Sequence, residues 1–169
     1  MEIIVETKAL DDMARHYKGA APIIASELKK AITRLVILGQ GEARKLAPVD
    51  TGRLKGSIAY EVLQTSGAIT GRFGTNVTYA KPVEYGTGLF STAPDSGGGR
   101  HWPPPSALDV WAARHGFTSG AEVAAIIGRR GGLKPRPYLR PAYAKIKPRV
   151  GEMIDRAATA ALMRIAKGG

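Results

Sequence analysis

The clearest pattern in the chain is an amphipathic helix, which we predict from Pro22 to Leu46. Apolar side chains recur there at three- to four-residue spacing and so share one helical face, beginning with Ile24, Leu28, Ala31 or Ile32, Leu35 and Leu38. Ala47-Pro48 ends the pattern because a residue before proline avoids helical geometry. Gly39 and Gly41 each weaken a helix by about 1 kcal/mol relative to alanine. We expect a close approach of the sheet or of a neighbouring helix to compensate.

Short apolar or alternating segments predict strands on both sides of this helix. Glu2–Glu6 suits a first or edge strand, and Asp11 and Asp12 offer caps for a short helical turn after it. Three further strands are predicted at 57–63, 68–74 and 76–83, with Ser66-Gly67 as the hairpin turn between the first two. We therefore expect an antiparallel sheet with one face covered by the long helix.

The second half of the chain predicts a loop followed by helices. Residues 86–105 are rich in glycine and proline and should form a long exposed loop. A short helix at 106–115 is predicted to be capped by Ser106 and to bury Leu108, Trp111 and Ala112, and another helix follows at 119–128. Prolines force an extended path over 129–141 before a last helix at 142–166, which Pro148 should kink.

Together these elements predict an α+β fold. An antiparallel sheet is packed by a long N-terminal helix and a long C-terminal helix, with a Gly/Pro-rich loop and a helical insertion over residues 86–135. A length of 169 residues suits one domain, so we expect residues 1–169 to form a single domain. The hydrophobic share of 44% is close to the globular average and argues against wholesale disorder.

Composition also limits the possible chemistry and location. Cysteine is absent, which excludes disulfides, thiolate nucleophiles and zinc sites with sulfur ligands. The longest aliphatic run, Leu35-Val36-Ile37-Leu38, is far shorter than a membrane span, and no basic-then-apolar leader opens the chain. We expect a soluble protein that is made in the cytoplasm.

Positive charge is concentrated in the second half. The chain has 25 Lys and Arg against 14 Asp and Glu, a net charge of +11. Residues 1–99 contribute 12 basic and 10 acidic side chains, whereas residues 100–169 contribute 13 and 4. From Arg129 to Arg149 eight basic residues occur with no acidic one. Such a run attracts polyanions or an acidic partner; alternatively, it is a solvated surface that keeps the protein soluble.

The usual signatures of catalysis are missing from the sequence. His16, His101 and His115 are scattered, without a second ligand at metal-binding spacing, and neither a phosphate-binding glycine loop nor a nucleophile elbow occurs. The only acidic residues near the glycine-rich turns are Glu42, Asp50 and Glu84. Asp50-Thr51-Gly52 is better explained as an Asx turn in which Gly52 adopts a positive φ. We therefore expect no enzyme, no metal and no cofactor.

Three segments resemble a known protein family when they are taken together and in this order. They are Ala47-Pro48-Val49-Asp50-Thr51-Gly52-Arg53-Leu54-Lys55-Gly56-Ser57-Ile58, then Tyr79-Ala80-Lys81-Pro82-Val83-Glu84-Tyr85-Gly86-Thr87-Gly88, then Arg136-Pro137-Tyr138-Leu139-Arg140-Pro141-Ala142. The chain resembles the gene-ten-type neck proteins of lambdoid and related long-tailed phages over about residues 20–165. These are known as tail-completion, head-tail joining or minor tail proteins. The helical segment that begins at Pro103 resembles an insertion found in only some members.

The resemblance implies a structural virion protein without a cofactor. Its copies are expected to form a sixfold or twelvefold ring in the neck, coaxial with the tail and around the DNA channel. The implied neighbours are an adaptor, stopper or other portal-side neck protein and the tail terminator or tail tube protein. The resemblance implies a place in the virion after synthesis in the host cytoplasm, with possible non-specific contact with channel DNA and no contact with a membrane.

Seven side chains are candidates for contact with other chains: Phe90, Trp102, Arg129, Arg130, Arg136, Tyr138 and Arg140. Aromatic and arginine side chains dominate the energetics of protein interfaces. Trp111 is a further candidate, although for Trp111 and Tyr138 ordinary core packing is an equal alternative. We also expect the glycine-rich loop and the proline-rich segment to become ordered only against neighbouring copies.

A stand-alone nucleic-acid-binding protein is the main alternative. The sequence pI of about 10.1 and the basic second half favour it, because phosphate contacts dominate such binding. However, aromatic residues do not alternate with the basic ones as a base-stacking surface requires, and no reading helix is evident. Partner docking is therefore our preferred interpretation of the basic run.

Overall fold

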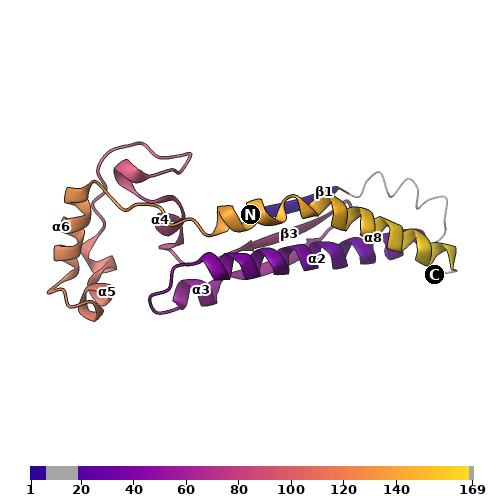
Figure 1. The fold of residues 1–169 in the computed structure, drawn as a ribbon, viewed down its shortest axis with the longest axis horizontal. Coiled ribbons are helices and arrows are strands. Elements are labelled where there is room, and N and C mark those ends of the chain that lie inside the picture. Colours follow the sequence, from indigo (N-terminus) through magenta and orange to yellow (C-terminus); the bar gives the residue numbers. More distant parts are fainter. Residues whose placement is uncertain (7–18, 168–169) are drawn as a thin grey trace. The chain divides into compact units, whose positions relative to one another are not determined.

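The computed structural model describes residues 1–6 and 19–167, drawn as a ribbon in Figure 1. The helical turn predicted near Asp11 lies outside these residues. The chain divides into two compact units, one of residues 1–76 with 138–169 and the other of residues 77–137. Each unit is described by itself, and the predicted single domain stays a prediction.

The long helix α2 organises the first unit. It spans Ala20–Leu46, which confirms the helix predicted from residue 22, and Ala47 leaves the helical region with ψ 127°. Leu28, Ile32 and Leu35 of the predicted stripe are buried, and so is Val36, which the stripe did not include. Leu38, also predicted on this face, is 40% exposed. Burial of this stripe supplies the main stabilisation of the helix, because two internal glycines lower its intrinsic propensity.

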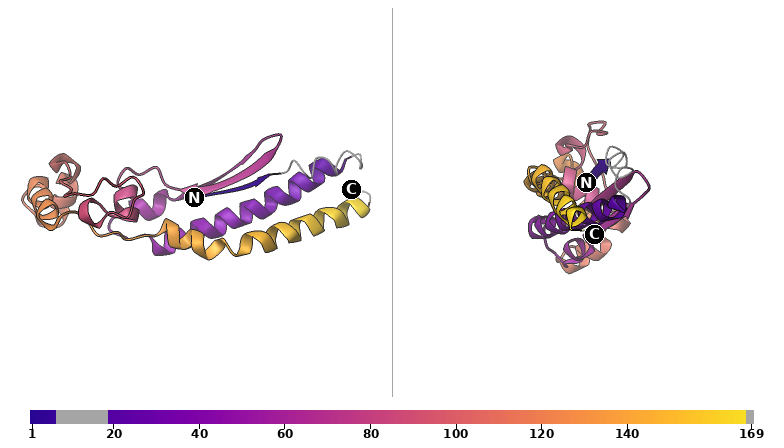
Figure 2. Two further views of the ribbon diagram at one scale, coloured as in Figure 1. Left: turned by 90° about the horizontal axis from the view of Figure 1, so that it is seen from above. Right: turned by 90° about the vertical axis from the view of Figure 1, so that its right-hand side faces the viewer.

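Three antiparallel strands form the sheet within the described residues. They are β1 (Glu2–Glu6), β2 (Ala59–Gln64) and β3 (Ala68–Gly74), in the spatial order β1-β3-β2. Thr65 N donates to Ala68 O at 2.9 Å, so Ser66-Gly67 is the predicted hairpin turn. Ile69 and Phe73 of β3 are buried, and α2 packs against this face. Figure 2 shows the sheet on one side of α2.

Two glycines allow α2 and β3 to approach closely. A Cβ atom on Gly39 would lie 2.6 Å from the ring of Phe73, and one on Gly71 would lie 2.6 Å from the Ile32 side chain. The predicted approach of helix to sheet is therefore confirmed at Gly39. By contrast, a Cβ on Gly41 would meet nothing within 4 Å.

A tight turn joins α2 to the sheet. Gly52 has φ 80°, the positive value that the sequence predicts, and the short helix α3 (Arg53–Ser57) follows it. The strand predicted from residue 57 therefore begins later, at Ala59. Ile58 O between them accepts hydrogen bonds from Gln40 Nε2 at 2.8 Å and from Arg44 Nη2 at 2.7 Å. These bonds fix the start of β2 against the end of α2.

The C-terminal segment forms two helices rather than one. Helix α7 (Leu139–Ile146) and helix α8 (Arg149–Ala166) are separated at Lys147 and Pro148, so the disruption predicted at Pro148 is confirmed as a break. The helix predicted from residue 142 begins three residues earlier, because Pro141 is tolerated in a first turn. Helix α8 lies beside α2 (Figures 1 and 2), and Ala157 joins the core formed by Leu28, Ile32 and Ile69.

In the second unit, the strand predicted at 76–83 is wrong. The structure has a helix, α4 (Ala80–Tyr85), with Gly86 beyond it at φ 73°. Alternating apolar residues suggest a strand here, but Pro82 is compatible with a first helical turn, and Gly86 N closes the helix on Pro82 O at 2.9 Å. A single turn of 3₁₀ helix, η1 (Gly88–Phe90), follows in the predicted loop.

The helical insertion has the two predicted helices with different ends. After the 3₁₀ turn η2 (Pro105–Ala107), helix α5 spans only Asp109–Arg114. Ser106 therefore lies in η2 and does not cap α5. Helix α6 (Gly120–Arg130) runs two residues further than predicted and shortens the extended segment accordingly. Ala112, Val123 and Ile127 form the small core of the insertion, packed by Leu108 and Phe117.

Candidate interaction surfaces

The seven interface candidates are distributed over both units. Phe90, Trp102, Arg129, Arg130 and Arg136 belong to the second unit, whereas Tyr138 and Arg140 belong to the first. The basic run from Arg129 to Arg149 therefore crosses the boundary between the units, and it is not one continuous element. The interface role of each residue stays a prediction, and the geometry of each is given within its own unit.

The glycine-rich loop is held by the segment that follows α6. Thr87 N donates to Leu133 O and Leu89 N donates to Gly131 O, both at 2.9 Å, while Leu133 N donates to Thr87 Oγ1 at 3.0 Å. Arg136 N donates a hydrogen bond to Val83 O at 2.8 Å. A single chain therefore supplies hydrogen-bond partners for both segments. Their ordering against neighbouring copies stays a prediction.

Two glycines make this pairing possible. Gly88 has φ 61°, and a Cβ there would collide with the carbonyl oxygen of Gly131. Gly132 has φ 137°, and a Cβ there would collide with the carbonyl of Thr87. Both positions combine a positive φ with a close backbone approach, which only glycine accommodates without strain. The glycine content of this region thus builds structure, and the predicted long exposed loop is in part a packed one.

The aromatic candidates of the second unit are partly exposed. Trp102 is 57% exposed, although its ring also lies against α6, where a Cβ on Gly128 would collide with it. Phe90 is half-buried, and Lys134 Nζ lies 5.8 Å from its ring centroid, within cation–π range. Each ring therefore rests on its own unit and leaves another part free for a partner.

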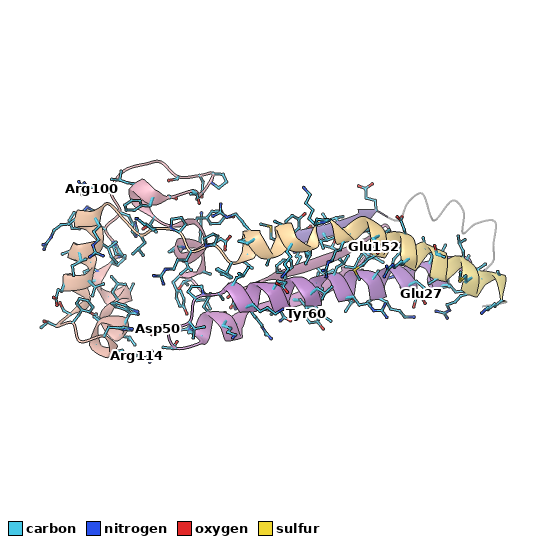
Figure 3. The ribbon with its side chains drawn as sticks, viewed as in Figure 1. Glu27, Asp50, Tyr60, Arg100, Arg114 and Glu152 are labelled. Carbon is cyan, nitrogen blue, oxygen red and sulfur yellow. The ribbon has the colours of Figure 1, made fainter. Side chains whose placement is uncertain are left out.

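Arg100 holds the C-terminal end of α6. Its Nη1 donates to Arg129 O at 2.7 Å and to Gly128 O at 3.3 Å, where the helix dipole favours a cation. Figure 3 labels Arg100 beside this helix. The side chains of Arg129 and Arg130 remain exposed there. Sequence reasoning missed Arg100, because nothing in a loop residue's local pattern indicates which distant carbonyls it will reach.

Trp111 forms an aromatic group with two neighbours instead of the buried helical face predicted for it. It stacks on His115 at 3.9 Å between ring centroids and contacts Phe117 at 5.7 Å, and it is 38% exposed. Ala112 alone of the three predicted residues is fully buried. Helix α5 is too short to bury the side chains on both of its faces. Trp111, its largest side chain, therefore lies at the edge of the small core of the insertion.

Tyr138 and Arg140, the candidates of the first unit, differ in exposure from those of the second. Tyr138 is fully buried, which agrees with its alternative interpretation as a core aromatic. Arg140 is half-buried in the first turns of α7. Neither side chain therefore presents a large free surface in the single chain.

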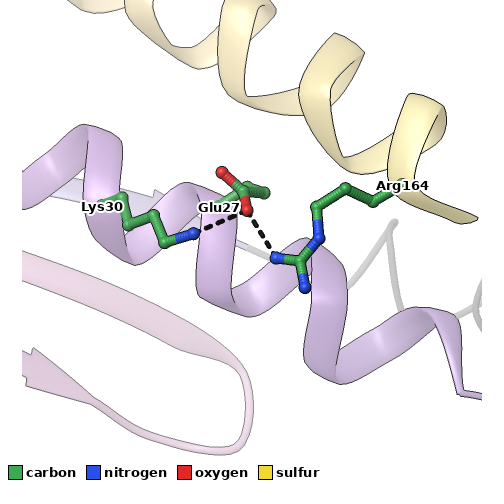
Figure 4. Close-up of polar contacts among 3 residues, drawn as sticks. All are labelled: Glu27, Lys30 and Arg164. Carbon is green, nitrogen blue, oxygen red and sulfur yellow. Dashed lines mark hydrogen bonds and ion pairs between the residues drawn. The ribbon is translucent and has the colours of Figure 1, made fainter. Parts of the chain in front are cut away.

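Two carboxylates on α2 tie this helix to the C-terminal helices. Glu42 Oε2 accepts from Lys145 Nζ of α7 at 2.6 Å, and Glu42 Oε1 accepts from Lys45 at 2.8 Å. Glu27 Oε1 accepts from Arg164 of α8 at 2.7 Å and from Lys30 at 2.8 Å (Figure 4). Each carboxylate therefore bridges a residue of its own helix and a distant one.

These bonds lower the pKa values of both carboxyl groups. Hydrogen bonds from Lys145 and then Lys45 lower the pKa of Glu42 from its ordinary value of 4.5 to about 2. Hydrogen bonds from Lys30 and then Arg164 lower the pKa of Glu27. A carboxylate engaged by two cations is a structural group, and it lacks the raised pKa that general-acid chemistry at neutral pH requires.

The three acidic residues considered for catalysis belong to two different units. Glu42 and Asp50 belong to the first unit, and Glu84, which is buried, belongs to the second. Within the described residues, no group of three or more His, Asp or Glu side chains is placed to hold a metal ion. No helix of that part of the chain has the length and apolar character needed to cross a membrane.

Comparison with known proteins gives one match. No curated protein and no solved structure matches the chain significantly. The match, over 82 of the 169 residues, covers the first motif and most of the second, but not Arg136-Pro137-Tyr138-Leu139-Arg140-Pro141-Ala142. It confirms the predicted resemblance for this part of the chain: residues 5–86 match the model of the HK97-gp10-like family, described as "Bacteriophage HK97-gp10, putative tail-component".

Proposed function

We propose that the chain is a structural subunit of the neck of a long-tailed phage virion, where identical copies form a ring between head and tail. The family match over residues 5–86 carries this proposal, since it identifies a phage tail component. The third motif, around Tyr138, follows in the order that the resemblance requires. The ring encloses the DNA channel and joins a portal-side adaptor or stopper to the tail terminator or tail tube.

The second unit supplies surfaces suited to these neighbours. Arg129, Arg130 and Arg136 have exposed side chains, and the exposed part of Trp102 adds an aromatic anchor. Arginine and tryptophan are enriched where interfaces derive most of their energy. A partner with acidic residues around a hydrophobic pocket fits this combination. The insertion resembles one found in only some members of the family, so it suits contact with neighbours specific to this phage.

Particle composition and morphology test the proposal. We expect mass spectrometry of purified virions to find the chain, and cryo-electron microscopy to place it in the neck. Phage that lack the gene should accumulate filled heads and separate tails. An Arg129→Ala/Arg130→Ala variant should be deficient in joining, whereas Arg114→Ala, another exposed arginine of this unit (Figure 3), should not be. Infectious virions without the chain would contradict the proposal.

Nucleic-acid binding is the second candidate function, supported by the net charge of +11. Phosphate contacts give an affinity that falls steeply with salt. A salt-titrated binding assay on duplex DNA distinguishes the two functions. Tight binding by the isolated monomer at physiological salt would favour this alternative, while weak, non-specific binding agrees with passing contact in a channel.

A further inference from the structure

The outer face of the sheet is exposed and carries an apolar row. Ile4, Thr70 and Leu63 are register partners across the three described strands. Ile4 is 58% exposed and Leu63 is 43% exposed. Successive residues of a strand point to opposite faces, so this row lies opposite the side that Ile69 and Phe73 bury against α2. Two large aliphatic side chains thus meet solvent at the centre of this face.

Carboxylates surround this row. Glu2, Arg72 and Glu61 form the neighbouring row across the same strands, and Glu6 ends β1 on the same face. Arg72 Nε pairs with Glu2 Oε2 at 2.8 Å, whereas Glu61 has no ion pair with any residue that the structure describes. Three carboxylates against one guanidinium give this face a net charge of −2.

Helix α2 presents an apolar and basic stripe on the side turned away from its core. Lys30, Arg34, Ile37, Gly41 and Lys45 recur at three- to four-residue spacing, the repeat of one helical face. The stripe lies opposite the buried positions of the same helix. Ile37 is 44% exposed at its centre, and both lysines and the arginine are exposed around it. This stripe therefore has the same layout as the sheet face, with the opposite charge.

The carboxylates beneath this stripe do not cancel its charge at the surface. The Lys30 side chain is 54% exposed while its partner Glu27 is 13% exposed. Lys45 and Glu42 show the same asymmetry. Arg34 has no ion pair among the described residues. A chain approaching from outside meets cations first, because the carboxylates lie deeper, against the C-terminal helices.

Gly41 has no role within the fold that requires glycine. A Cβ there would meet nothing within 4 Å, unlike one on Gly39. Glycine inside a helix lowers its stability by about 1 kcal/mol relative to alanine. A missing side chain at the centre of an exposed face lets another backbone or a large side chain approach closely. This second observation points to the same surface as the exposed Ile37.

From this complementarity we infer that the outer sheet face of one copy docks on the outward α2 face of the next copy. Ile4 and Leu63 pack against Ile37, and the carboxylates of the sheet face Lys30, Arg34 and Lys45. The inference rests on the proposed ring and names the contact between its subunits. Two different surfaces of the same chain form a head-to-tail contact, the type that repeats and closes into a ring.

A symmetric contact between two equal faces is disfavoured by charge. If two sheet faces met, Glu61 of one copy would face a glutamate of the other copy: Glu2, Glu6 or Glu61. If two α2 faces met, Arg34 of one copy would face a basic residue of the other copy: Lys30, Arg34 or Lys45. Like charges facing each other across an interface cost several kcal/mol. The head-to-tail arrangement instead pairs a net negative surface with a positive one at every contact.

Charge reversal in the full-length chain tests this contact. The variants are Glu61→Lys on the sheet and Arg34→Glu on α2, and self-association is measured by sedimentation velocity. Glu61→Lys brings the net charge of the sheet face from −2 to 0, and Arg34→Glu brings that of the α2 face from +3 to +1. We therefore expect each variant alone to associate at least about tenfold more weakly than the natural chain. An equimolar mixture of the two should assemble again, because the lysine introduced in one variant then meets the glutamate introduced in the other. Arg114→Glu and Asp155→Lys serve as controls with exposed charges outside both faces.

The outcomes separate the contact from the ring. If the natural chain assembles and both single variants assemble equally well, or if their mixture fails to recover, the sheet-to-helix contact is overturned and the ring proposal stands. If the natural chain remains monomeric at all concentrations and occurs as single copies in virions, the ring itself is wrong. Loss in both single variants with recovery in the mixture supports the contact.

Cross-linking gives a readout that is independent of charge. The chain has no cysteine, so Leu63→Cys/Ile37→Cys introduces the only two thiols. A bismaleimide should convert this double variant into a ladder of oligomers, whereas either single variant should yield monomers. Dimers from a single variant would indicate a symmetric contact and overturn the inference. Far-UV circular dichroism confirms that each variant is folded.

Discussion

The ring of Phe73 on β3 lies 2.6 Å from the position that a Cβ atom on Gly39 would occupy. Real Cβ atoms do not approach a carbon atom so closely, so α2 reaches this distance from the sheet only with glycine at that position. The neighbouring helical glycine, Gly41, meets nothing within 4 Å. Two residues that look equivalent in the sequence therefore have opposite relationships to the core.

The different surroundings of Gly39 and Gly41 predict that a glycine-to-alanine substitution changes the free energy of unfolding in opposite directions at the two positions. Gly39→Ala should lower the free energy of unfolding by about 1–3 kcal/mol, the usual cost of overpacking a core. Gly41→Ala should raise it by up to about 1 kcal/mol, because alanine favours the helix and meets no neighbour. Chemical denaturation followed by circular dichroism measures both. Equal changes at the two positions would show that the close approach to Phe73 is not a constraint.

The bridge from Glu42 to Lys145 predicts a loss of stability in acid. The pKa of Glu42 is lowered from 4.5 to about 2 in the folded chain. A carboxyl group with a lowered folded pKa contributes stability that is present above its unfolded pKa and is lost as the pH falls through the folded pKa. The contribution of Glu42 should therefore disappear between about pH 4.5 and about pH 2.

Two substitutions isolate this effect. Glu42→Gln should remove the Glu42 component from the pH dependence of unfolding over that interval, and Lys145→Ala should reduce it by removing the donor that lowers the pKa most. Urea denaturation at a series of pH values measures the slopes. A Glu42→Gln profile that is parallel to that of the natural chain would contradict the assignment.

Elements set by local periodicity were predictable from the sequence. The stripe from Leu28 to Leu35 places α2, and the alternation on both sides of Ser66-Gly67 places the hairpin. The error at 76–83 has a physical reason. Residues before Gly86 alternate as in a strand, yet the segment forms α4, and Arg136 N bonds to Val83 O from far along the chain. Short apolar segments do not distinguish helix from strand by pattern alone.

The candidate surfaces were predictable only as residue types. Arginine and tryptophan positions could be named, but the contacts that hold them are long-range. Arg100 donates to the last carbonyls of α6, about thirty residues away in the sequence. Leu89 N donates to the carbonyl oxygen of Gly131, on the far side of the insertion in the sequence. The sheet and α2 faces likewise required register and helix orientation, because charge complementarity emerges only after Ile4, Thr70 and Leu63 are placed in one row.

The N-terminal cap of α6 predicts a local loss of stability. Ser119 Oγ accepts from Glu122 N at 3.3 Å, and Glu122 Oε2 accepts from Thr118 N at 3.0 Å. Ser119→Ala should lower the stability of the insertion by about 1 kcal/mol, the usual value of a cap. Ser119→Asp retains an acceptor and should restore most of it. Hydrogen exchange of the α6 amides measures the effect, and an equal loss for alanine and aspartate would exclude capping as the cause.

The hydroxyl of Thr87 predicts how firmly the glycine-rich loop is held. Thr87 Oγ1 accepts from Leu133 N at 3.0 Å, while Thr87 N donates to Leu133 O at 2.9 Å. Thr87→Val keeps the shape and the backbone bond but removes the acceptor, so it should cost about 1 kcal/mol and speed hydrogen exchange at the Leu133 amide about fivefold. Thr78→Val, at an exposed threonine of the same unit, controls for the general effect of a valine. If the Leu133 amide exchanges equally fast in both variants, the side-chain bond does not hold the loop, and the backbone bonds and the glycine contacts carry that role alone.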